Sequence, residues 1–439
     1  MKPILAVLAM LASFGVAQAA PVPPGYARDG KTCGGYPRVQ IETLPGMCAG
    51  LVTGPPPGGL RPSRRVLRLP RTLLILPDGD LLVVDLGSWE PGHGSVWRLS
   101  PVVGAPPKLT RLLSGLDLPH TAALGPDGRV YVGEMSRIVR FDPQASAPSE
   151  TVETVIAGLP SNKLHDNRHP LSSFIFDADG ALLVNVGAPS DQCAADVAAG
   201  RCAEAEGERP AAAVWRFASL GQGRWSQTPT GGACGRRNVL ALLRLPSGEI
   251  LQAENSIDVA DSAWPYDEIN LLRPGGHYGW PYCVGAGEPA PAWKARVAGC
   301  VDGTYSPPAL MLPPHSAPLS LVVYDGAMFP QLQGRLLVSL HGYRAAGSRI
   351  VAYAIDQAGV PKPSARAGYW IYDSKGAPRR RAFRSAPAAD GIAVTPGWRA
   401  FAGHRPSGSP VGLAVAADGA IWVAEDRTGA ILRFARDAP

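Results

Sequence analysis

Three groups of polar residues in this chain carry side chains that could do chemistry. The first ends at His169, whose imidazole titrates near neutral pH and can accept a proton from a hydroxyl group. The second contains Arg237 and Asn238, a guanidinium and an amide that could bind a carboxylate or a carbonyl oxygen. The third contains His341 and Arg344. Together they offer a possible proton acceptor and donors for an anion, but from the residues alone a hydrogen bond that fixes the loop is the favoured role for His169.

A further set of residues offers oxygen atoms to a hard cation. Glu254 and Asn255 follow an apolar run, and Asp267 and Glu268 come after a loop. Carboxylate and carbonyl oxygens are the ligands that Ca²⁺ takes in proteins. For Asp267 and Glu268 the alternative, a hydrogen bond that fixes the loop, is favoured from the residues alone.

These residues lie within a repeated sequence pattern. An apolar stretch, a tight turn and a β-branched or aromatic run return about six times, with turns at Asp78-Gly79, Asp127-Gly128, Asp179-Gly180, Ser247-Gly248, Gly334 and Asp418-Gly419. Two apolar runs joined by Asp-Gly are a strong signal for a β-hairpin, because the turn needs positive φ angles. A hairpin repeated at such intervals predicts a propeller.

The fold class predicted is therefore all-β, a six-bladed β-propeller with long loops on the face that carries the chemistry. The predicted blades cover residues 66–115, 116–160, 161–230, 231–300, 310–360 and 405–437. Four stretches are too long for a blade and are expected to be functional loops: residues 188–210, 255–268, 281–315 and 357–409.

The N-terminus has the pattern of a secretory signal peptide. A charged start, an apolar run and Ala17-Gln18-Ala19 predict a leader over residues 1–19. Residues 20–65, rich in Pro and Gly, are expected to form an N-terminal arm, and residues 66–439 the propeller. We expect a periplasmic or secreted protein, with no membrane span because no other segment is long and apolar enough.

The charge distribution and the cysteine content limit which classes of binding partner and covalent cofactor are expected. The net charge is +6, but the basic residues are scattered except in Pro378–Arg384, which is interpreted as a solvated loop, so no nucleic-acid partner is expected. Seven cysteines in an exported chain permit disulfides, and the neighbours in sequence are Cys33 with Cys48, Cys193 with Cys202 and Cys283 with Cys300. Cys234 is left over, and a C-x-x-C-H haem motif is missing.

Five motifs, taken in order, resemble those of the glucose/sorbosone dehydrogenases that use pyrroloquinoline quinone (PQQ), and most closely the sorbosone dehydrogenase branch. They are G-x-R-N at 235–238, D-E-I-N at 267–270, G-G-x-Y-G-W-P-Y-C at 275–283, L-P-P-H-S-A-P-L at 312–319, and H-G followed by Arg at 341–344. The resemblance covers residues 66–437, nearly the whole chain after the arm.

The resemblance implies a role for each candidate residue. His169 stands where the family has its catalytic base, and Arg237 and Asn238 match positions that contact PQQ, which lies over the propeller axis. Arg344 is a further candidate for a PQQ carboxylate. The loop at Glu254 and Asn255 matches backbone carbonyls that bind Ca²⁺, and Asp267 is a further candidate for that ion. The implied substrate is an aldose, a sorbosone-like aldehyde or a polyol, with electrons passing to a soluble acceptor.

The chain departs from the family at several of these positions. Ala188 stands where an aspartate orients the catalytic histidine, and Asp191 or Asp166 is a possible substitute. Leu240 stands where some members have a glutamine that contacts the cofactor. Two alternatives stay open: a calcium-dependent lactonase-type hydrolase that uses Glu254, Asn255 and Asp267, and a divergent, non-catalytic binding propeller that has lost PQQ. A single active site requires His169 and Arg237 at the same end of the channel.

Overall fold

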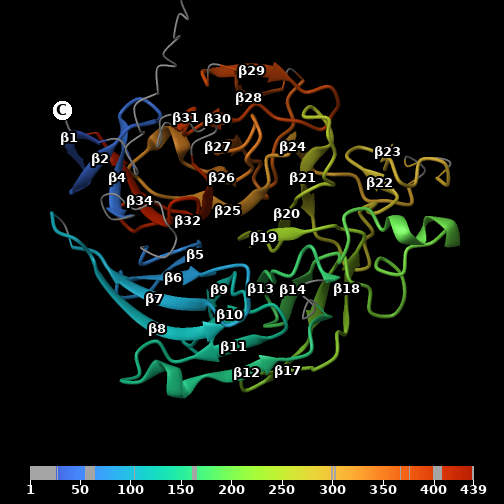
Figure 1. Cartoon of the computed structure of the whole chain (residues 1–439), viewed down its shortest axis with the longest axis horizontal. Helices are drawn as coiled ribbons and strands as arrows, with labels where there is room; N and C mark the ends of the chain where they lie inside the picture. The colour runs from blue at the N-terminus through green and yellow to red at the C-terminus, as the bar shows by residue number, and fades with distance from the viewer. Residues whose placement is uncertain are drawn as a thin grey trace, which may run out of the picture.

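The computed structural model describes residues 26, 28–54, 65–102, 104–160, 166–297, 300, 303–365, 367–374, 376–398 and 408–437. The predicted signal peptide, residues 1–19, lies outside the described residues. The described chain is built almost entirely of antiparallel strands, which form six sheets around a central axis (Figure 1). The predicted fold class, an all-β six-bladed propeller, is confirmed.

Each blade has its first strand at the axis and its later strands toward the rim. In chain order the first three blades are β5(Pro70–Ile75)–β6(Leu81–Asp85)–β7(Gly94–Ser100)–β8(Lys108–Leu116), β9(Ala122–Leu124)–β10(Val130–Gly133)–β11(Ile138–Phe141)–β12(Glu153–Ile156), and β13(Phe174–Phe176)–β14(Leu182–Val186)–β15(Ala213–Phe217)–β18(Gly231–Cys234). The fourth and fifth are β19(Val239–Arg244)–β20(Ile250–Glu254)–β21(Tyr266–Leu271)–β24(Leu310–Pro314), and β25(Pro318–Tyr324)–β26(Arg335–Leu340)–β27(Arg349–Ala354)–β30(Ile392–Ala393).

The sixth blade joins the two ends of the chain. Its strands β32(Pro410–Val415), β33(Ile421–Glu425) and β34(Ala430–Arg436) are followed in the sheet by β4(Met47–Thr53), β2(Tyr36–Val39) and β1(Arg28–Cys33). Leu432 pairs with Leu51, and Phe434 with Ala49. The segment set apart from the sequence as an N-terminal arm therefore supplies strands to the last blade and closes the ring.

Side-chain alternation along the strands builds the core between blades. In β6, Leu81 and Val83 pack on the side of the sixth blade, whereas Leu82 and Val84 pack on the side of the second. This follows from the period of two in a β-strand, and it explains why the second strands are apolar on both faces.

Three blade boundaries differ from the prediction. The strand β18, expected at the start of the fourth blade, belongs to the third, and β30, from the predicted loop 357–409, completes the fifth. Leu310–Pro314, assigned from the sequence to the start of the fifth blade, forms the outermost strand of the fourth and pairs with β21. Long insertions separate β21 from β24, so the sequence did not reveal that the chain returns to the same blade. The predicted loop 357–409 also contains a hairpin at the rim, β28(Gly368–Tyr372) and β29(Pro378–Ala382).

A buried carboxylate stabilises four of the blades in the same way. Asp85, Glu134, Glu254 and Glu425 each stand six residues after the turn glycine of their repeat, at or next to the end of the second strand. Each accepts a hydrogen bond from the backbone N–H of a residue ahead of the first strand: Leu69 at 2.7 Å, Asp117 at 2.7 Å, Arg237 at 2.6 Å and Ser409 at 3.0 Å, respectively. In blades three and five this position is apolar, Val186 and Leu340. The carboxylates therefore fix the chain where it enters each of these four blades.

The three pairs of cysteines that are neighbours in sequence form disulfides, Cys33–Cys48, Cys193–Cys202 and Cys283–Cys300, and Cys234 is the free cysteine of the described residues. Within the same residues, no helix is both long enough and apolar enough to cross a membrane.

Replacing Glu134 tests the structural role of these carboxylates away from the candidate site. Glu134→Ala leaves the buried N–H of Asp117 without its acceptor and removes the ion pair with Arg137 at 2.8 Å. We expect the free energy of unfolding to fall by about 1.5–3 kcal/mol, the range for a hydrogen bond to a charged group. Urea unfolding measures it, with the exposed Glu150→Ala as control. Equal stability of the two variants would contradict this role.

Candidate functional site

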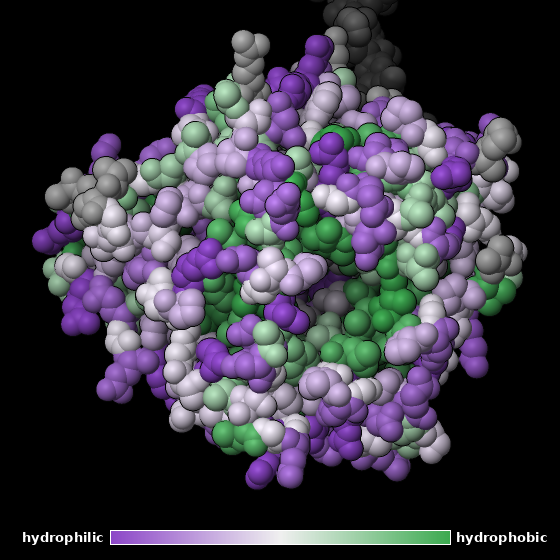
Figure 2. All heavy atoms as spheres, turned by 180° about the vertical axis from the view of Figure 1, so that it is seen from behind, coloured by the Kyte–Doolittle hydropathy of each residue, from purple (hydrophilic) through white to green (hydrophobic). Residues whose placement is uncertain are grey.

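The loops at the ends of the blades opposite the Asp-Gly turns surround a pocket of about 450 Å³. It brings together the predicted residues His169, Arg237, Asn255, Asp267 and Arg344. Asn238 and Glu254 do not line it. Below the loops, the first strands of the blades enclose a narrower axial cavity of about 180 Å³. Figure 2 shows one face of the propeller, where a hollow ringed by hydrophobic residues opens at the centre.

The backbone of one residue, Ala188, orients His169. Its Nδ1 lies 2.5 Å from the carbonyl oxygen of Ala188, and the N–H of Ala188 donates to the carbonyl of Arg237 at 2.8 Å. Because a carbonyl oxygen only accepts, Nδ1 carries the ring proton and Nε2 carries the lone pair. A Cβ on Gly187 would lie 2.6 Å from the Cβ of His169, so a glycine is required for this close approach. A backbone carbonyl thus defines the tautomer where the family uses an aspartate.

The pKa of His169 is lowered to about 3, first by burial and then by the positive charge of Arg237. The side chain is 6% exposed, so its charged form would lose most of its hydration. His169 is therefore a neutral imidazole near pH 7, with Nε2 able to accept a proton.

Arg237 is held by acidic residues of its own chain. Its Nε donates to Asp191 at 2.7 Å, its Nη2 donates to Asp258 at 2.8 Å, and its Nη1 lies 3.4 Å from the carbonyl of Asn255. Asp191, a suggested partner for His169, binds Arg237 instead. Sequence reasoning missed Asp258, which lies in a long loop and has no motif to mark it.

Glu254 and Asn238 support the pocket from behind. The carboxylate of Glu254 binds the backbone N–H of Arg237, and the carbonyl of Asn238 accepts from the N–H of Asn255 at 3.0 Å. Burial raises the pKa of Glu254 to about 7. Burial also raises the pKa of Glu268 well above its usual value, with the charge of the neighbouring Glu254 adding to the effect.

Asp267 lines the pocket while it fixes two loops. It accepts hydrogen bonds from the backbone N–H groups of Ser256 at 2.8 Å and Ala317 at 2.7 Å, and from the Ser316 hydroxyl at 3.1 Å. Burial raises its pKa. These bonds correspond to the loop-fixing role that the sequence left as the favoured alternative.

Oxygen donors for a cation remain at the Asn255 loop. Asn255 and Ser256 both line the pocket, and the buried Oδ1 of Asn255 has no hydrogen-bond partner among the described residues. An amide oxygen of this kind, on a residue that lines the same pocket as Asp267, fits a hard cation and an anionic ligand bound to it. Arg344, also on the pocket wall, adds a positive charge that fits a carboxylate.

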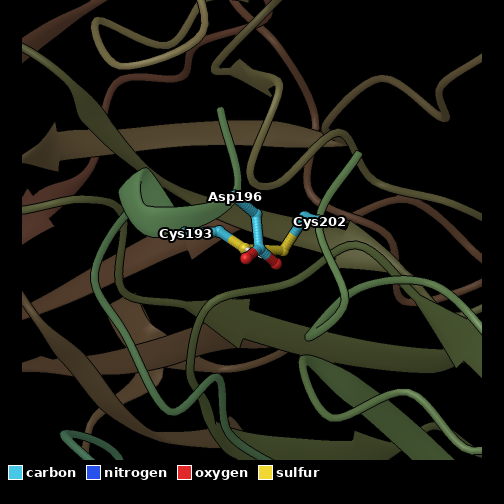
Figure 3. A group of neighbouring side chains, drawn as sticks. All are labelled: Cys193, Asp196 and Cys202. Carbon is cyan, nitrogen blue, oxygen red and sulfur yellow. Dashed lines mark hydrogen bonds between the residues drawn. A yellow bond between two sulfur atoms is a disulfide. The ribbon is translucent and has the colours of Figure 1, made fainter. Parts of the chain in front are cut away.

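A second group of potential metal ligands does not form a metal centre. Cys193, Asp196 and Cys202 lie together, but the two sulfurs are joined in a disulfide (Figure 3). Asp196 accepts from the backbone N–H of Ala203 at 2.7 Å. Thiolate ligands are therefore lacking, and the group stabilises the loop after β14.

Blades one and five supply another wall of the pocket. It contains Trp89, His341 and Tyr343, and behind them His341 Nε2 lies 3.0 Å from the buried Asp426. Asp426 also pairs with the buried Arg71 at 3.1 Å. His341 was identified from the sequence, whereas Trp89 and Asp426 were missed, because they stand in other blades and no motif connects them with His341.

His315 belongs to the same pocket but is engaged with backbone. Its Nε2 lies 2.7 Å from the carbonyl of Asp261 and 2.9 Å from that of Trp264. These contacts bind His315 to the loop between β20 and β21.

Solved structures with a similar fold cover nearly the whole chain. A Carbohydrate-Active Enzymes family AA12 protein of Trichoderma reesei, in an iodide structure, has a TM-score of 0.64 at 18% identity, over 94% of this chain and 100% of that one. The holo form of the pyranose dehydrogenase PQQ domain of Coprinopsis cinerea has a TM-score of 0.61 at 19% identity, over 92% and 100%. The PQQ-bound aldose sugar dehydrogenase of Streptomyces coelicolor has a TM-score of 0.54 at 18% identity, over 94% and 100%. At these identities the likeness shows the fold.

No curated protein sequence matches the chain significantly. The sequence model of the Glucose / Sorbosone dehydrogenase family matches residues 130–356, more than half of the chain, from the second blade to the end of the fifth blade's third strand. This span includes His169, Arg237, Asn255 and Arg344. The chain belongs to the glucose/sorbosone dehydrogenase family.

Proposed function

We propose that the protein is an exported PQQ-dependent oxidoreductase that oxidises an aldose, a sorbosone-like aldehyde or a polyol. Family membership supports an oxidoreductase that acts on sugars. The observation that carries the proposal is the state of His169, a neutral imidazole whose Nδ1–H is bound by Ala188 and whose ring lines the pocket. The relatives whose structures are described as PQQ-bound, holo or calcium forms support the cofactors.

His169 would be the catalytic base. Its Nε2 takes the proton from the hydroxyl group of the substrate, and its Nδ1–H bond to Ala188 strengthens as the ring becomes positive. When bound, PQQ would supply the two-electron acceptor for the hydride that leaves the same substrate carbon. Arg237 opposes a charge on His169 before substrate arrives, which keeps the base unprotonated.

The remaining predicted residues would hold the cofactor. Arg344 would pair with a PQQ carboxylate, and Arg237 would act with its two aspartates as a fixed group of charges beside the quinone. Asn238 would act indirectly, because its backbone carbonyl accepts a hydrogen bond from the N–H of Asn255 and holds that residue on the pocket wall. Ca²⁺ would be bound by backbone carbonyls of the Glu254–Asn255 loop and by Asp267.

Two features bear on the alternatives. A lactonase-type hydrolase needs the side chains of Glu254, Asn255 and Asp267 on one metal, but the Glu254 carboxylate binds a backbone N–H and does not line the pocket. The binding-propeller hypothesis is favoured if His169 and Arg237 lie apart, yet both line one pocket. These contacts favour the dehydrogenase.

Export and the soluble electron acceptor are parts of the same proposal. Three disulfides support an oxidising compartment. The leader expected at residues 1–19 would direct the chain there, and the electrons would pass to a soluble acceptor.

The first test is reconstitution of the mature protein with PQQ and Ca²⁺, with dye reduction as the assay for aldoses, sorbosone and polyols. We expect sugar-dependent reduction that requires both additions. In His169→Ala we expect kcat to fall by about 10²–10⁴, the usual effect of removing a general base. The exposed His93→Ala, outside the pocket, is the matched control. Unchanged kcat in His169→Ala would contradict the assignment of the base.

The second test is the ionisation of His169. Because its pKa in the folded protein, about 3, lies below the usual 6.5, unfolding takes up a proton between these pH values. Its contribution to stability is therefore complete above pH 6.5 and is lost as the pH falls toward 3. We expect the ¹⁵N signals of the His169 ring to stay those of the Nδ1–H tautomer from pH 7.5 to about 4.5. A titration midpoint near 6.5 would show that burial and Arg237 do not control the ring.

A further inference from the structure

Most of the net charge of the chain is concentrated in one insertion at the rim of blade five. Between β27 and β30, residues 355–391 contain seven lysines and arginines and three aspartates, a net charge of +4 out of +6 for the whole chain. Pro378–Arg384, interpreted from the sequence as a solvated loop, contains the strand β29, which pairs with β28 in a hairpin outside the ring of blades (Figure 1). The charge is therefore carried on an ordered element.

Acidic partners offset only part of this charge. Arg379 pairs with Asp373 at 3.2 Å, and Arg380 is paired as well. Arg381 and Arg384 are exposed and pair with no carboxylate among the residues that the structure describes. The hairpin thus presents guanidinium groups that are free to meet an anionic surface.

The hairpin is held against a wall of the pocket. The backbone N–H of Tyr372, at the end of β28, donates to the carbonyl of Ala345 at 2.8 Å. Ala345 directly follows Arg344, which lines the pocket. Tyr372 pairs with Pro378, and a strand rises about 3.4 Å per residue, so Arg381 lies about 10 Å along β29 from this contact. The basic surface therefore begins beside the pocket.

A second set of contacts fixes the hairpin to blade four. The ring of Tyr369, in β28, lies 6.4 Å from that of Tyr266, in β21, and 4.8 Å from that of Phe383. The Tyr266 hydroxyl accepts the backbone N–H of Arg384 at 2.9 Å. The strand that carries the arginines is thus fixed relative to the pocket, as a preformed docking surface requires.

The proposed reaction has to pass its electrons to another molecule. Oxidation of a hydroxyl group to a carbonyl group releases two electrons and two protons, so a one-electron acceptor is used twice per substrate while both protons go to solvent. Redox proteins meet through small interfaces, in which complementary charge steers the encounter. A basic surface beside the pocket attracts an acidic partner and repels a second copy of this chain.

We propose that the hairpin β28–β29 docks an acidic one-electron redox protein beside the pocket. This docking role rests on the proposed function, because the pocket is the source of the electrons. Two molecules of the acceptor are reduced in turn for each substrate molecule that is oxidised. Since the attraction is between exposed charges, it acts on the association rate and weakens as salt is added.

The experiment compares cytochrome c, a basic haem protein, with its succinylated form, in which lysines are converted to carboxylates on the same fold. Both are offered to the protein reconstituted with PQQ and Ca²⁺, with the sugar that the dye assay identifies. At about 20 mM salt we expect the second-order rate of reduction of the succinylated form to be at least about tenfold higher. The difference should shrink at about 500 mM salt.

Variants of the two unpaired arginines locate the docking surface. In the double variant Arg381→Glu, Arg384→Glu we expect the low-salt rate with succinylated cytochrome c to fall about tenfold, with dye reduction within twofold of wild type. The double variant Arg381→Gln, Arg384→Gln, which removes charge without adding repulsion, should lose less. Arg224→Glu, which changes an exposed arginine in the blade-three insertion between β15 and β18, is the matched control and should keep the wild-type rate.

A binding measurement without turnover separates docking from the proposed function. Surface plasmon resonance on the protein free of PQQ should show saturable binding of succinylated cytochrome c at low salt. We expect the Kd to rise about tenfold in the Glu double variant and to stay within twofold in Arg224→Glu. Intact binding in a protein that oxidises no sugar would contradict the proposed function and leave the docking surface for an acidic protein in place.

Three results would overturn the docking role. The first is an equal rate of reduction for both forms of cytochrome c at low salt. The second is an equal loss in Arg224→Glu and the Glu double variant, which would assign the preference to the overall charge of the protein. The third is hairpin-dependent binding of phosphatidylglycerol vesicles without binding of succinylated cytochrome c, which would assign the hairpin to a membrane surface.

Discussion

One line of hydrogen bonds runs from the propeller framework to the imidazole of His169. The Glu254 carboxylate binds the N–H of Arg237, the carbonyl of Arg237 binds the N–H of Ala188, and the carbonyl of Ala188 binds Nδ1 of His169. The first bond is the same blade-stabilising contact found at Asp85, Glu134 and Glu425. The candidate base is therefore oriented by a repeated element of the fold.

The position of this line explains how the pocket is divided. Blades three and four supply the buried polar side, where His169, Arg237 and Asp267 lie and where charges are paired or hydrogen-bonded. Blades five, six and one supply Tyr343, Asp426 and Trp89, respectively. On this side the buried carboxylate of Asp426 holds the residues behind the two exposed rings. A ring of blades allows both sides to be built independently, since residues on opposite blades need only share the axis.

The fold could be predicted from the sequence because its signals are local. Turn residues such as Asp78-Gly79 and the apolar runs beside them mark hairpins, and six copies of one hairpin define the propeller. The pairing of β4 with β34 could not be seen, because strands from opposite ends of the chain share no local signal. The same holds for β24, which returns to its blade after a long insertion.

The sequence predicted the site residues that belong to motifs. It missed the contacts that are made by backbone groups or by residues distant in the sequence. His169, Arg237 and Arg344 were found by side-chain type and order, and all three line the pocket. The sequence shows that Ala188 replaces an aspartate, but the backbone carbonyl that orients His169 instead leaves no trace in residue identity. Nor does the pairing of Arg237 with Asp258, or of His341 with Asp426, because each joins separate loops.

The measurement that tests the central claim most directly is an equilibrium titration of the purified protein with PQQ, followed by absorbance and repeated with and without Ca²⁺. Saturation at one PQQ per chain that requires Ca²⁺ and is weakened in Arg344→Ala is expected. No PQQ binding in either condition would contradict the account.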